Sequence, residues 1–398
     1  MRVTNATIRA VNGLTARWAG VAEGGTVFSA AGVWPLLAFL ADGAAGRTRE
    51  ELADAVGLPA DRAASAAREL LAALGSAHGV DSALGLWTKR TLELHERWES
   101  GLPADAHGVL TGDVEVDHKA LDTWASERTG GLIERMPVEV KDSTELVLAG
   151  ALAMRTRWLR PFRETPWCPE VGPWGGGEVY LGLRRSSTLL DRIGVADTPD
   201  GHVTELKVCG TGALDVHLLL GEEGMTPGQV LRAGVGLLTD RDRVVPGDRL
   251  PYGEAGPGVR VRRVRAMRPA PPTLNVTTAA YEVRASHDLL KRHELFGLTT
   301  ARTAVAGHFP GVSDFPLCIG SAQQAAVAKF GALGFEAAAV TAMAAAPGAG
   351  IPQLRWMVTT VEADFDRPFA FLAVHRHTRL VLAAGWVTEP VPFPGVRW

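Results

Sequence analysis

The stretch LVLAGALAM at 146–154 decides the fold class, because the pattern of the sequence changes there. Its unbroken apolar run is typical of a buried strand. Before it, apolar residues recur at helical spacing over 26–41, 61–74 and 118–136. After it, strand patterns dominate, and nothing alternates strand with helix. Helices first and strands later predict an α+β fold.

Local signals support both halves of this prediction. In the helical half, Ser29 is a candidate N-cap, and Thr48–Glu51 has the pattern of a capping box for a helix that ends near Gly57. The alternating residues 82–88 predict a strand between two of the helices.

In the second half, segments at 203–220 and 256–285 are split by Gly and Pro, and the nearly continuous apolar run 370–387 closes the sheet-rich part. One further helix is predicted at 286–297.

The chain has 398 residues, no internal repeat and no linker rich in Pro or Ser. We therefore predict one domain over 1–398, helix-rich over 1–145 and sheet-rich over 146–398. With 46% hydrophobic residues and a formal net charge of -3, the composition indicates a folded core and excludes a globally basic nucleic-acid binder. Only six of the 41 basic residues are Lys, which favours a high-GC, bacterial source.

Compartment and metal chemistry are also constrained by the sequence. Three cysteines without a CxxC pattern exclude a disulfide scaffold and argue against a zinc cluster. The N-terminus lacks the apolar run of a secretory signal, so we expect a cytoplasmic protein if the start is native, and a secreted one if the chain is a trimmed mature form. No membrane partner, cofactor or metal is expected.

Residues 334–350, GFEAAAVTAMAAAPGAG, do not fit the surrounding pattern. Their side chains are mostly small, and alanine is the best helix former, so a short surface helix is one interpretation. The other is an exposed loop whose residues are kept small for a reason.

Four blocks in order resemble the serpin family, over nearly the whole chain. They are the early helix block from Val27 to Thr48, the block from Trp124 to Ile133 with the strand that runs to Phe162, GFEAAAVT at 334–341, and DRPFAF at 366–371 with GWVTEP at 385–390. The resemblance implies a monomeric serpin fold, with helices around a large, mainly antiparallel central sheet, smaller sheets beside it, and an exposed reactive-centre loop at about 334–360.

The resemblance also implies a function. A serpin offers a reactive bond in this loop to a serine, and sometimes a cysteine, protease. Cleavage lets the loop enter the central sheet as a new strand while the protease remains covalently attached. The leading hypothesis is therefore a protease inhibitor, not an enzyme, whose partner is an unidentified serine protease.

The hinge, defined as the start of this loop, would enter the sheet first. Its residues are Gly334, Phe335, Glu336, Ala337, Ala338, Ala339 and Thr341. In an inserted strand alternate residues face the core. If Phe335 faces inward, the other inward positions through 345 are Ala, Thr and Met, which fit. Phe335 stands where the family has Thr or Ser, and its bulk is expected to slow insertion.

Other positions depart from the family's pattern in the region that opens the sheet. Trp158 is retained. The expected glutamate and lysine correspond to Ala332 and Ala280, and the mid-sheet histidine and asparagine to Gln324 and Gly150. These changes motivate an alternative: a non-inhibitory serpin fold that serves as a small-molecule binding protein, or a biosynthetic enzyme with a pocket between helices and sheet.

The position of the reactive bond stays open. Counting from the hinge gives Gly348-Ala349, counting back from Pro368 gives Met357-Val358, and Arg355-Trp356 lies between them. The C-terminal count ranks Met357 first.

Two further patterns have a functional and a structural interpretation. Arg260, Arg262, Arg263 and Arg265 could bind a polyanion, although a solvated strand face is favoured. His375 and His377 could share a metal, but no carboxylate or Cys lies near them in sequence, so a solvated strand face is again favoured.

Overall fold

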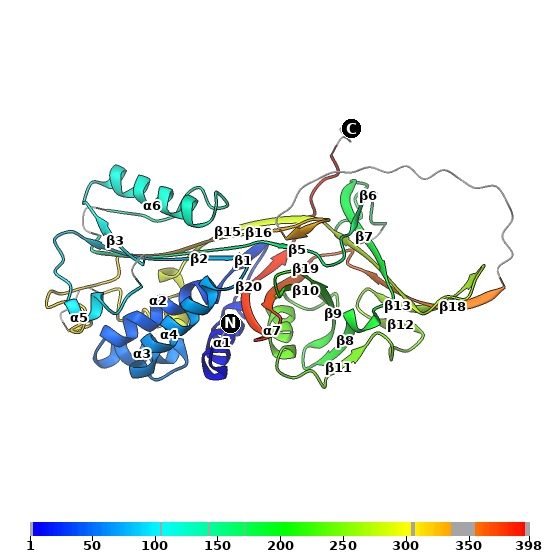
Figure 1. The fold of residues 1–398 in the computed structure, drawn as a ribbon, viewed down its shortest axis with the longest axis horizontal. Helices are drawn as coiled ribbons and strands as arrows, with labels where there is room; N and C mark the ends of the chain where they lie inside the picture. Colours follow the sequence, from blue (N-terminus) through cyan, green and yellow to red (C-terminus); the bar gives the residue numbers. More distant parts are fainter. Residues whose placement is uncertain are drawn as a thin grey trace.

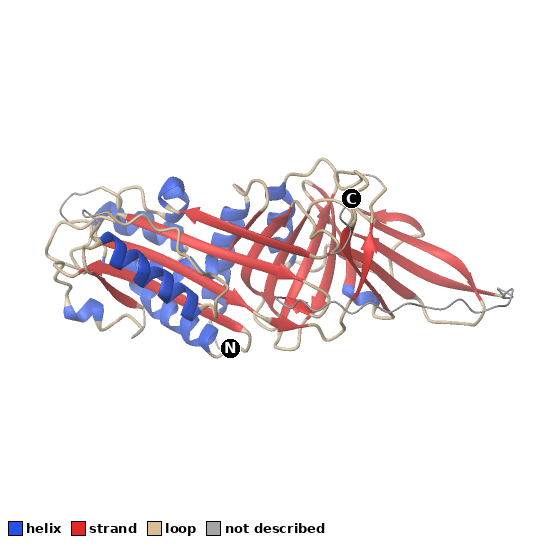
Figure 2. Cartoon of the chain, turned by 90° about the horizontal axis from the view of Figure 1, so that it is seen from above, coloured by secondary structure: helices blue, strands red, loops and turns tan. Residues whose placement is uncertain are grey.

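Three β-sheets form the frame of the molecule, and helices pack around one end of it (Figures 1 and 2). The computed structural model describes residues 3–103, 106–141, 144–170, 172–303, 307–335 and 355–394. In these ranges no helix is both long and apolar enough to cross a membrane.

The first sheet, called the central sheet here, has the strand order β3-β2-β4-β16-β17-β5, and β15 pairs with the other edge of β16. Its strands are β2 (Val80–Lys89), β3 (His107–Leu110), β4 (Leu146–Met154), β5 (Thr156–Arg157), β15 (Tyr281–Asp288), β16 (Ser321–Phe330) and β17 (Gly334–Phe335). Most neighbours are antiparallel, but β4 is parallel to β16 and β2 is parallel to β3.

The second sheet is antiparallel throughout and has the order β1-β20-β19-β10-β9-β8-β11. Its strands are β1 (Thr26–Phe28), β8 (Ile193–Thr198), β9 (Gly201–Cys209), β10 (Leu214–Gly221), β11 (Val244–Pro246), β19 (Phe369–His375) and β20 (Leu380–Val387). Every residue of β19 and β20 is buried, which explains why the sequence there is apolar without a period of two.

The third sheet has the order β12-β13-β18-β14-β7-β6 and extends to the end of the molecule away from most helices (Figure 1). Its strands are β6 (Arg163–Trp167), β7 (Tyr180–Ser187), β12 (Gly253–Gly256), β13 (Val259–Ala266), β14 (Thr273–Ala279) and β18 (Trp356–Asp364).

Helices cover both faces of the central sheet, and a further helix packs on the second sheet. They are α1 (Asn5–Ala19), α2 (Ala30–Gly43), α3 (Gly46–Val56), α4 (Ala60–Gly75), α5 (Glu96–Glu99), α6 (Val114–Arg128), α7 (Pro227–Leu237) and α8 (His293–Phe296). Figure 1 shows α6 alone on one face, and α2, α3 and α4 on the other. Leu121 and Ala125 of α6 pack on Val147 and Ala149 of β4, whereas Leu146 and Leu148 face the main core. Successive side chains of β4 therefore face opposite sides of the sheet, and both sides are buried, which explains why β4 has no polar residue.

The α+β prediction is confirmed, and the strand predicted at 146–154 has the bounds of β4. Ser29 caps α2 by accepting a hydrogen bond from Gly32 N, and Gly57 ends α3 in the left-handed conformation with φ 72°.

Three local predictions were wrong. α3 begins at Gly46, so Thr48 lies inside the helix, where its buried hydroxyl contacts His308. The helix predicted over 118–136 ends at Arg128, before two glycines of positive φ. The region predicted as a helix at 286–297 continues β15 to Asp288, and α8 is only one turn long.

Tyr281 of β15 carries a buried hydroxyl with no hydrogen-bond partner among the described residues. Its ring stacks on Phe330 and on Phe371, with ring centroids 5.2 Å apart in each pair. Burial raises the pKa of Tyr281 well above its ordinary value. A buried, unsatisfied hydroxyl costs about 1–3 kcal/mol.

We therefore expect Tyr281→Phe to raise the free energy of unfolding by about 1 kcal/mol, seen as a higher urea midpoint. Tyr180→Phe is the matched control, because the Tyr180 hydroxyl donates to Glu178 at 2.8 Å and its removal loses a bond. Equal losses in both variants would contradict the assignment of an unsatisfied hydroxyl.

Candidate functional site

The candidate site is the place where the central sheet divides. β4 and β16 pair directly from Val147–Ser321 to Leu152–Ala326. Beyond this stretch β17 lies between β16 and β5, with Phe335 opposite Phe330 and Thr156, and Gly334 opposite Arg157. We call the space between β4–β5 and β16 the slot. β17, two residues long, fills its open end and runs antiparallel to both neighbours.

Phe335 is already inside this slot. Its side chain is 2% exposed, and its ring centroid lies 6.3 Å from that of Phe371 on β19. The sequence predicts that Phe335 delays insertion because it must enter a packed sheet. In the structure Phe335 faces the core of the intact chain. Its expected effect on the rate of insertion stays a prediction.

Gly334 is required by the close approach of β5. A Cβ at this position would lie 2.2 Å from the carbonyl oxygen of Thr156, a distance that no side chain tolerates. The glycine therefore lets the chain turn directly from β16 into the slot.

Trp158 holds the turn that connects β16 to β17. Its indole Nε1 donates to Gly331 O at 2.9 Å, and its backbone N donates to Leu333 O at 2.9 Å. The indole also packs on Phe330, with ring centroids 4.9 Å apart. The structure thus brings Trp158 together with the hinge, as a support for its first residues.

Ala332 and Ala280 lie nearby and are both buried. Neither side chain can form the ion pair that glutamate and lysine would offer. Instead the backbone carries the contacts: Phe162 N donates to Ala332 O at 2.9 Å, and Ala280 N donates to Leu181 O at 2.8 Å.

Gln324 lies at the other end of the slot, where β4 and β16 are still paired. Its side chain is 1% exposed and binds the backbone of Ser29 in both directions. Oε1 accepts from Ser29 N at 2.8 Å, and Nε2 donates to Ser29 O at 2.7 Å. The Ser29 hydroxyl in turn donates to Leu382 O at 2.6 Å. Gln324 therefore ties β16 to the start of α2 and, through Ser29, to β20.

Gly150 is the cross-strand neighbour of Gln324. A Cβ there would lie 2.9 Å from the carbonyl oxygen of Gly32, so the glycine allows β4 to touch the first turn of α2. β4 is held at this level by close packing, whereas β16 is held by hydrogen bonds.

His287 is a site residue that the sequence analysis missed. It lies opposite Gln324 on β15, and its Nε2 donates to Val27 O at 2.8 Å. Burial lowers the pKa of His287. The alternating pattern at 281–287 could have predicted that His287 lies in a strand, but the sequence analysis assigned residues 286–297 to a helix.

The candidates for the reactive bond fall into two groups. Trp356, Met357 and Val358 belong to β18 and pair with Ala266, Arg265 and Val264 of β13. Arg355 directly precedes this strand. The remaining loop candidates lie outside the described residues: Glu336, Ala337, Ala338, Ala339, Thr341, Gly348 and Ala349.

The arginine-rich stretch forms β13, on the third sheet, and its arginines are exposed. Arg260 pairs with Glu254, Arg262 pairs with Glu362, and Arg263 donates to the Tyr252 hydroxyl. Glu254 and Glu362 balance two of the four positive charges, which favours the solvated strand face. Across the described parts of the chain, no group of three or more His, Cys, Asp or Glu is placed to hold a metal ion.

Comparison with known proteins agrees with this geometry. The family model described as serpin (serine protease inhibitor) matches residues 4–167. Putative serpin-Z6C of Oryza sativa subsp. japonica is 25% identical over 400 residues, which cover 93% of this chain and 91% of the rice protein.

Two solved structures share the fold. The thermophilic serpin tengpin in its native state has a TM-score of 0.74 at 14% identity and covers 98% of this chain and 95% of its own. Thyroxine-binding globulin in complex with thyroxine has a TM-score of 0.72 at 17% identity and covers 97% of this chain and 98% of its own.

The chain is therefore similar to serpins: the family model matches its first part, and the curated relatives match it at 25–28% identity. The other curated relatives that match are also plant serpins, so they give no support to the bacterial source expected from composition.

Replacing Gln324 tests the contact between β16 and α2. Gln324→Leu leaves Ser29 N and Ser29 O buried without their partners, so we expect the free energy of unfolding to fall by about 2 kcal/mol or more. Gln323→Leu is the matched control, because its side chain lies on the opposite face and is partly exposed. Urea midpoints of the two variants measure the difference, and a Gln324→Leu protein as stable as the control would refute the contact.

Proposed function

We propose that this protein inhibits a serine protease, or a cysteine protease, by cleavage of its loop, insertion of the loop into the central sheet and covalent trapping of the protease. One observation carries the proposal: the hinge has already begun the additional strand. Gly334 and Phe335 lie between β16 and β5.

The direction of the strands supports this route. Because β4 and β16 are parallel, a strand placed between them can be antiparallel to both, as β17 is. Continuing the register from Phe335 opposite Phe330 would place residue 337 opposite Ala328 and residue 339 opposite Ala326. Both alanines are buried on the core face, so the added strand would find small neighbours there.

The alternation follows from Phe335. Since Phe335 faces the core, Ala337, Ala339 and Thr341 would also face it in the inserted strand, and Glu336 and Ala338 would face outward. This is the pattern that insertion needs, with small residues inside and the charged residue outside.

The pairing of β18 bears on the reactive bond. A protease binds several extended residues on both sides of the bond it cuts, and Met357 and Val358 are paired with β13. Cleavage between them would require this end of the strand to detach. Arg355-Trp356 is disfavoured for the same reason, because Trp356 is also paired with β13. We therefore propose the bond Gly348-Ala349, which lies N-terminal to β18 and favours an elastase-like target.

The direct experiment incubates the protein with subtilisin, elastase, chymotrypsin and trypsin, and separates the products by denaturing electrophoresis. Inhibition by trapping gives a band at the summed mass of protein and protease. Mass spectrometry of the released C-terminal fragment identifies the bond. Clean cleavage in 348–358 without such a band, for all four proteases, would reject the proposal.

A pair of adjacent substitutions tests whether insertion is required. Ala337→Arg would place a charged side chain in the core of the extended sheet, so we expect it to be cleaved without forming the covalent band. Ala338→Arg would point to the outer face and should retain most of the band. Equal behaviour of the two variants would contradict the proposed register, even if the protein inhibits.

A second candidate function is a non-inhibitory binding protein. Ala332 and Ala280 stand where the family has two charged groups in the region that opens the sheet. Thyroxine-binding globulin, which has this fold, forms a complex with the small molecule thyroxine. Cleavage without trapping would favour this candidate.

A further inference from the structure

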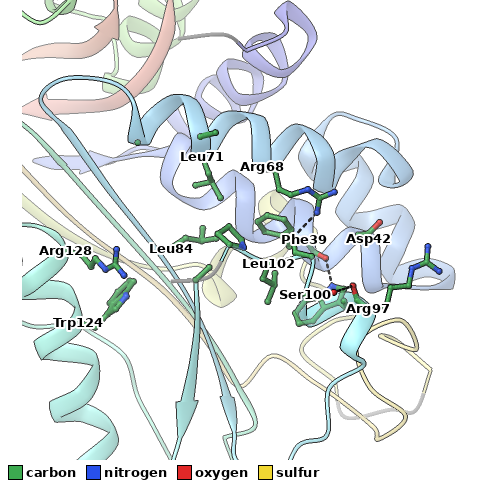
Figure 3. Close-up of a pocket in the computed structure, with 16 residues that line it drawn as sticks. Phe39, Asp42, Arg68, Leu71, Leu84, Arg97, Ser100, Leu102, Trp124 and Arg128 are labelled. Carbon is green, nitrogen blue, oxygen red and sulfur yellow. Dashed lines mark hydrogen bonds between the residues drawn. The ribbon is translucent and has the colours of Figure 1, made fainter.

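A cavity of about 880 Å³ lies beside the central sheet, away from the slot. It is enclosed by α2, α4, β2 and the segment around α5, and α6 reaches one end of it (Figure 3). Cavities of roughly 300–1,000 Å³ are the usual size for small-molecule sites. Gly334 and Phe335, the hinge residues that the structure describes, do not line this cavity.

The floor of the cavity is apolar. Phe39 of α2, Leu71 of α4 and Leu84 of β2 approach one another there, and Leu102 faces them (Figure 3). Trp98 completes this wall, and its indole Nε1 already donates to Phe39 O at 3.1 Å. The indole N–H of Trp98 is therefore not available to a ligand, and the ring contributes only apolar surface to the cavity.

The rim of the cavity is cationic. Three arginines, Arg68, Arg97 and Arg128, line it together with a single carboxylate, Asp42. Figure 3 shows Arg68 and Arg97 toward one end, whereas Arg128 lies with Trp124 at the other. All three arginines are exposed at the surface, so a ligand's charged group could reach them without being desolvated completely.

Arg68 is held in position for binding. Its Nη1 donates to Gly101 O at 3.0 Å, which fixes the guanidinium at the rim. A guanidinium has five N–H donors, so others remain for an anion. No side-chain hydrogen bond or ion pair of Arg97 is found among the residues that the structure describes. The two groups thus provide donors beside an apolar floor.

From this arrangement we propose that the cavity binds a small amphipathic carboxylate, such as a medium-chain fatty acid or an aryl-alkyl acid. The hydrocarbon part would lie on Phe39, Leu71 and Leu84, and the carboxylate would face Arg68 and Arg97. The cavity is lined by three arginines and one aspartate, so its net charge is positive and favours an anionic head group over a cationic one. Arginine is well suited to this role, because its planar fork matches a carboxylate.

Isothermal titration calorimetry on the full chain tests the proposal with dodecanoate as the probe. Dodecyltrimethylammonium and dodecan-1-ol, which have the same chain and a cationic or neutral head group, serve as comparisons. We expect one dodecanoate per chain, bound at least tenfold more tightly than either comparison. Equal affinities, or many weak sites, would overturn the proposal.

Two substitutions separate this cavity from other apolar surfaces. Arg68→Gln with Arg97→Gln should weaken dodecanoate at least tenfold, whereas Arg62→Gln, on the same helix but outside the cavity, should not. Ala72→Trp should abolish binding by filling the space, because Ala72 is exposed and lines the cavity. Ser65→Trp is its control on α4.

Arg68 and Arg97 are exposed, so their replacement is not expected to disturb folding. The double arginine variant therefore tests the proposal even if Ala72→Trp fails to fold. Unchanged affinity in the double arginine variant would refute the assignment of the head group. No protease enters these experiments, so their outcome is independent of the proposed inhibition.

Discussion

The direct pairing of two parallel strands, β4 and β16, is the constraint on which the rest of the structure depends. Residues 147–152 of β4 are paired directly with residues 321–326 of β16. A further strand could be inserted between them only if this pairing were broken. Neighbouring strands lie about 4.8 Å apart, so admitting one strand requires β4 and β16 to separate by about that distance. The hinge shows the result on a small scale, because β17 has already separated β16 from β5.

Different contacts hold the two sides of this pair. β16 is tied to α2 and β20 through Gln324 and Ser29, whereas β4 touches α2 at Gly150 without a side-chain hydrogen bond. On the outer face, Val147 and Ala149 of β4 pack under α6. Opening the slot would therefore require either β4 to leave its packing on α2 or β16 to leave the hydrogen bonds of Gln324. In the proposed mechanism, the barrier to this movement keeps the intact fold from inserting its loop.

Much of the architecture could be predicted from residue patterns, because burial on two faces leaves an unbroken apolar run. β4, β19 and β20 are of this kind. Helix and strand bounds failed where distant contacts decide them. Thr48 has the signature of a cap, yet it is buried against His308, 260 residues away in sequence. β15 continues past residue 285 because β16 pairs with it as far as Asp288.

The residues of the candidate site could be predicted from the sequence, but their packing and hydrogen bonds could not. The resemblance to serpins identified Trp158, Gln324 and the hinge. It could not show that Phe335 is already buried, because that depends on the turn at 331–333 and on the space beside Phe371. Likewise, Gln324 looks like a substitution for a family histidine, and only the structure shows that both of its amide atoms are bonded to Ser29.

The central claim is that the slot can accept a whole strand. Insertion would add backbone hydrogen bonds on both sides, each contributing about 0.5–1.5 kcal/mol, together with the burial of alternate side chains. The most direct measurement is a thermal melting curve of the intact protein and of the protein nicked within 348–358 by limited proteolysis. The account predicts a clear rise in melting temperature after the cut. An unchanged or lower melting temperature would show that the loop does not enter the sheet, and would contradict it.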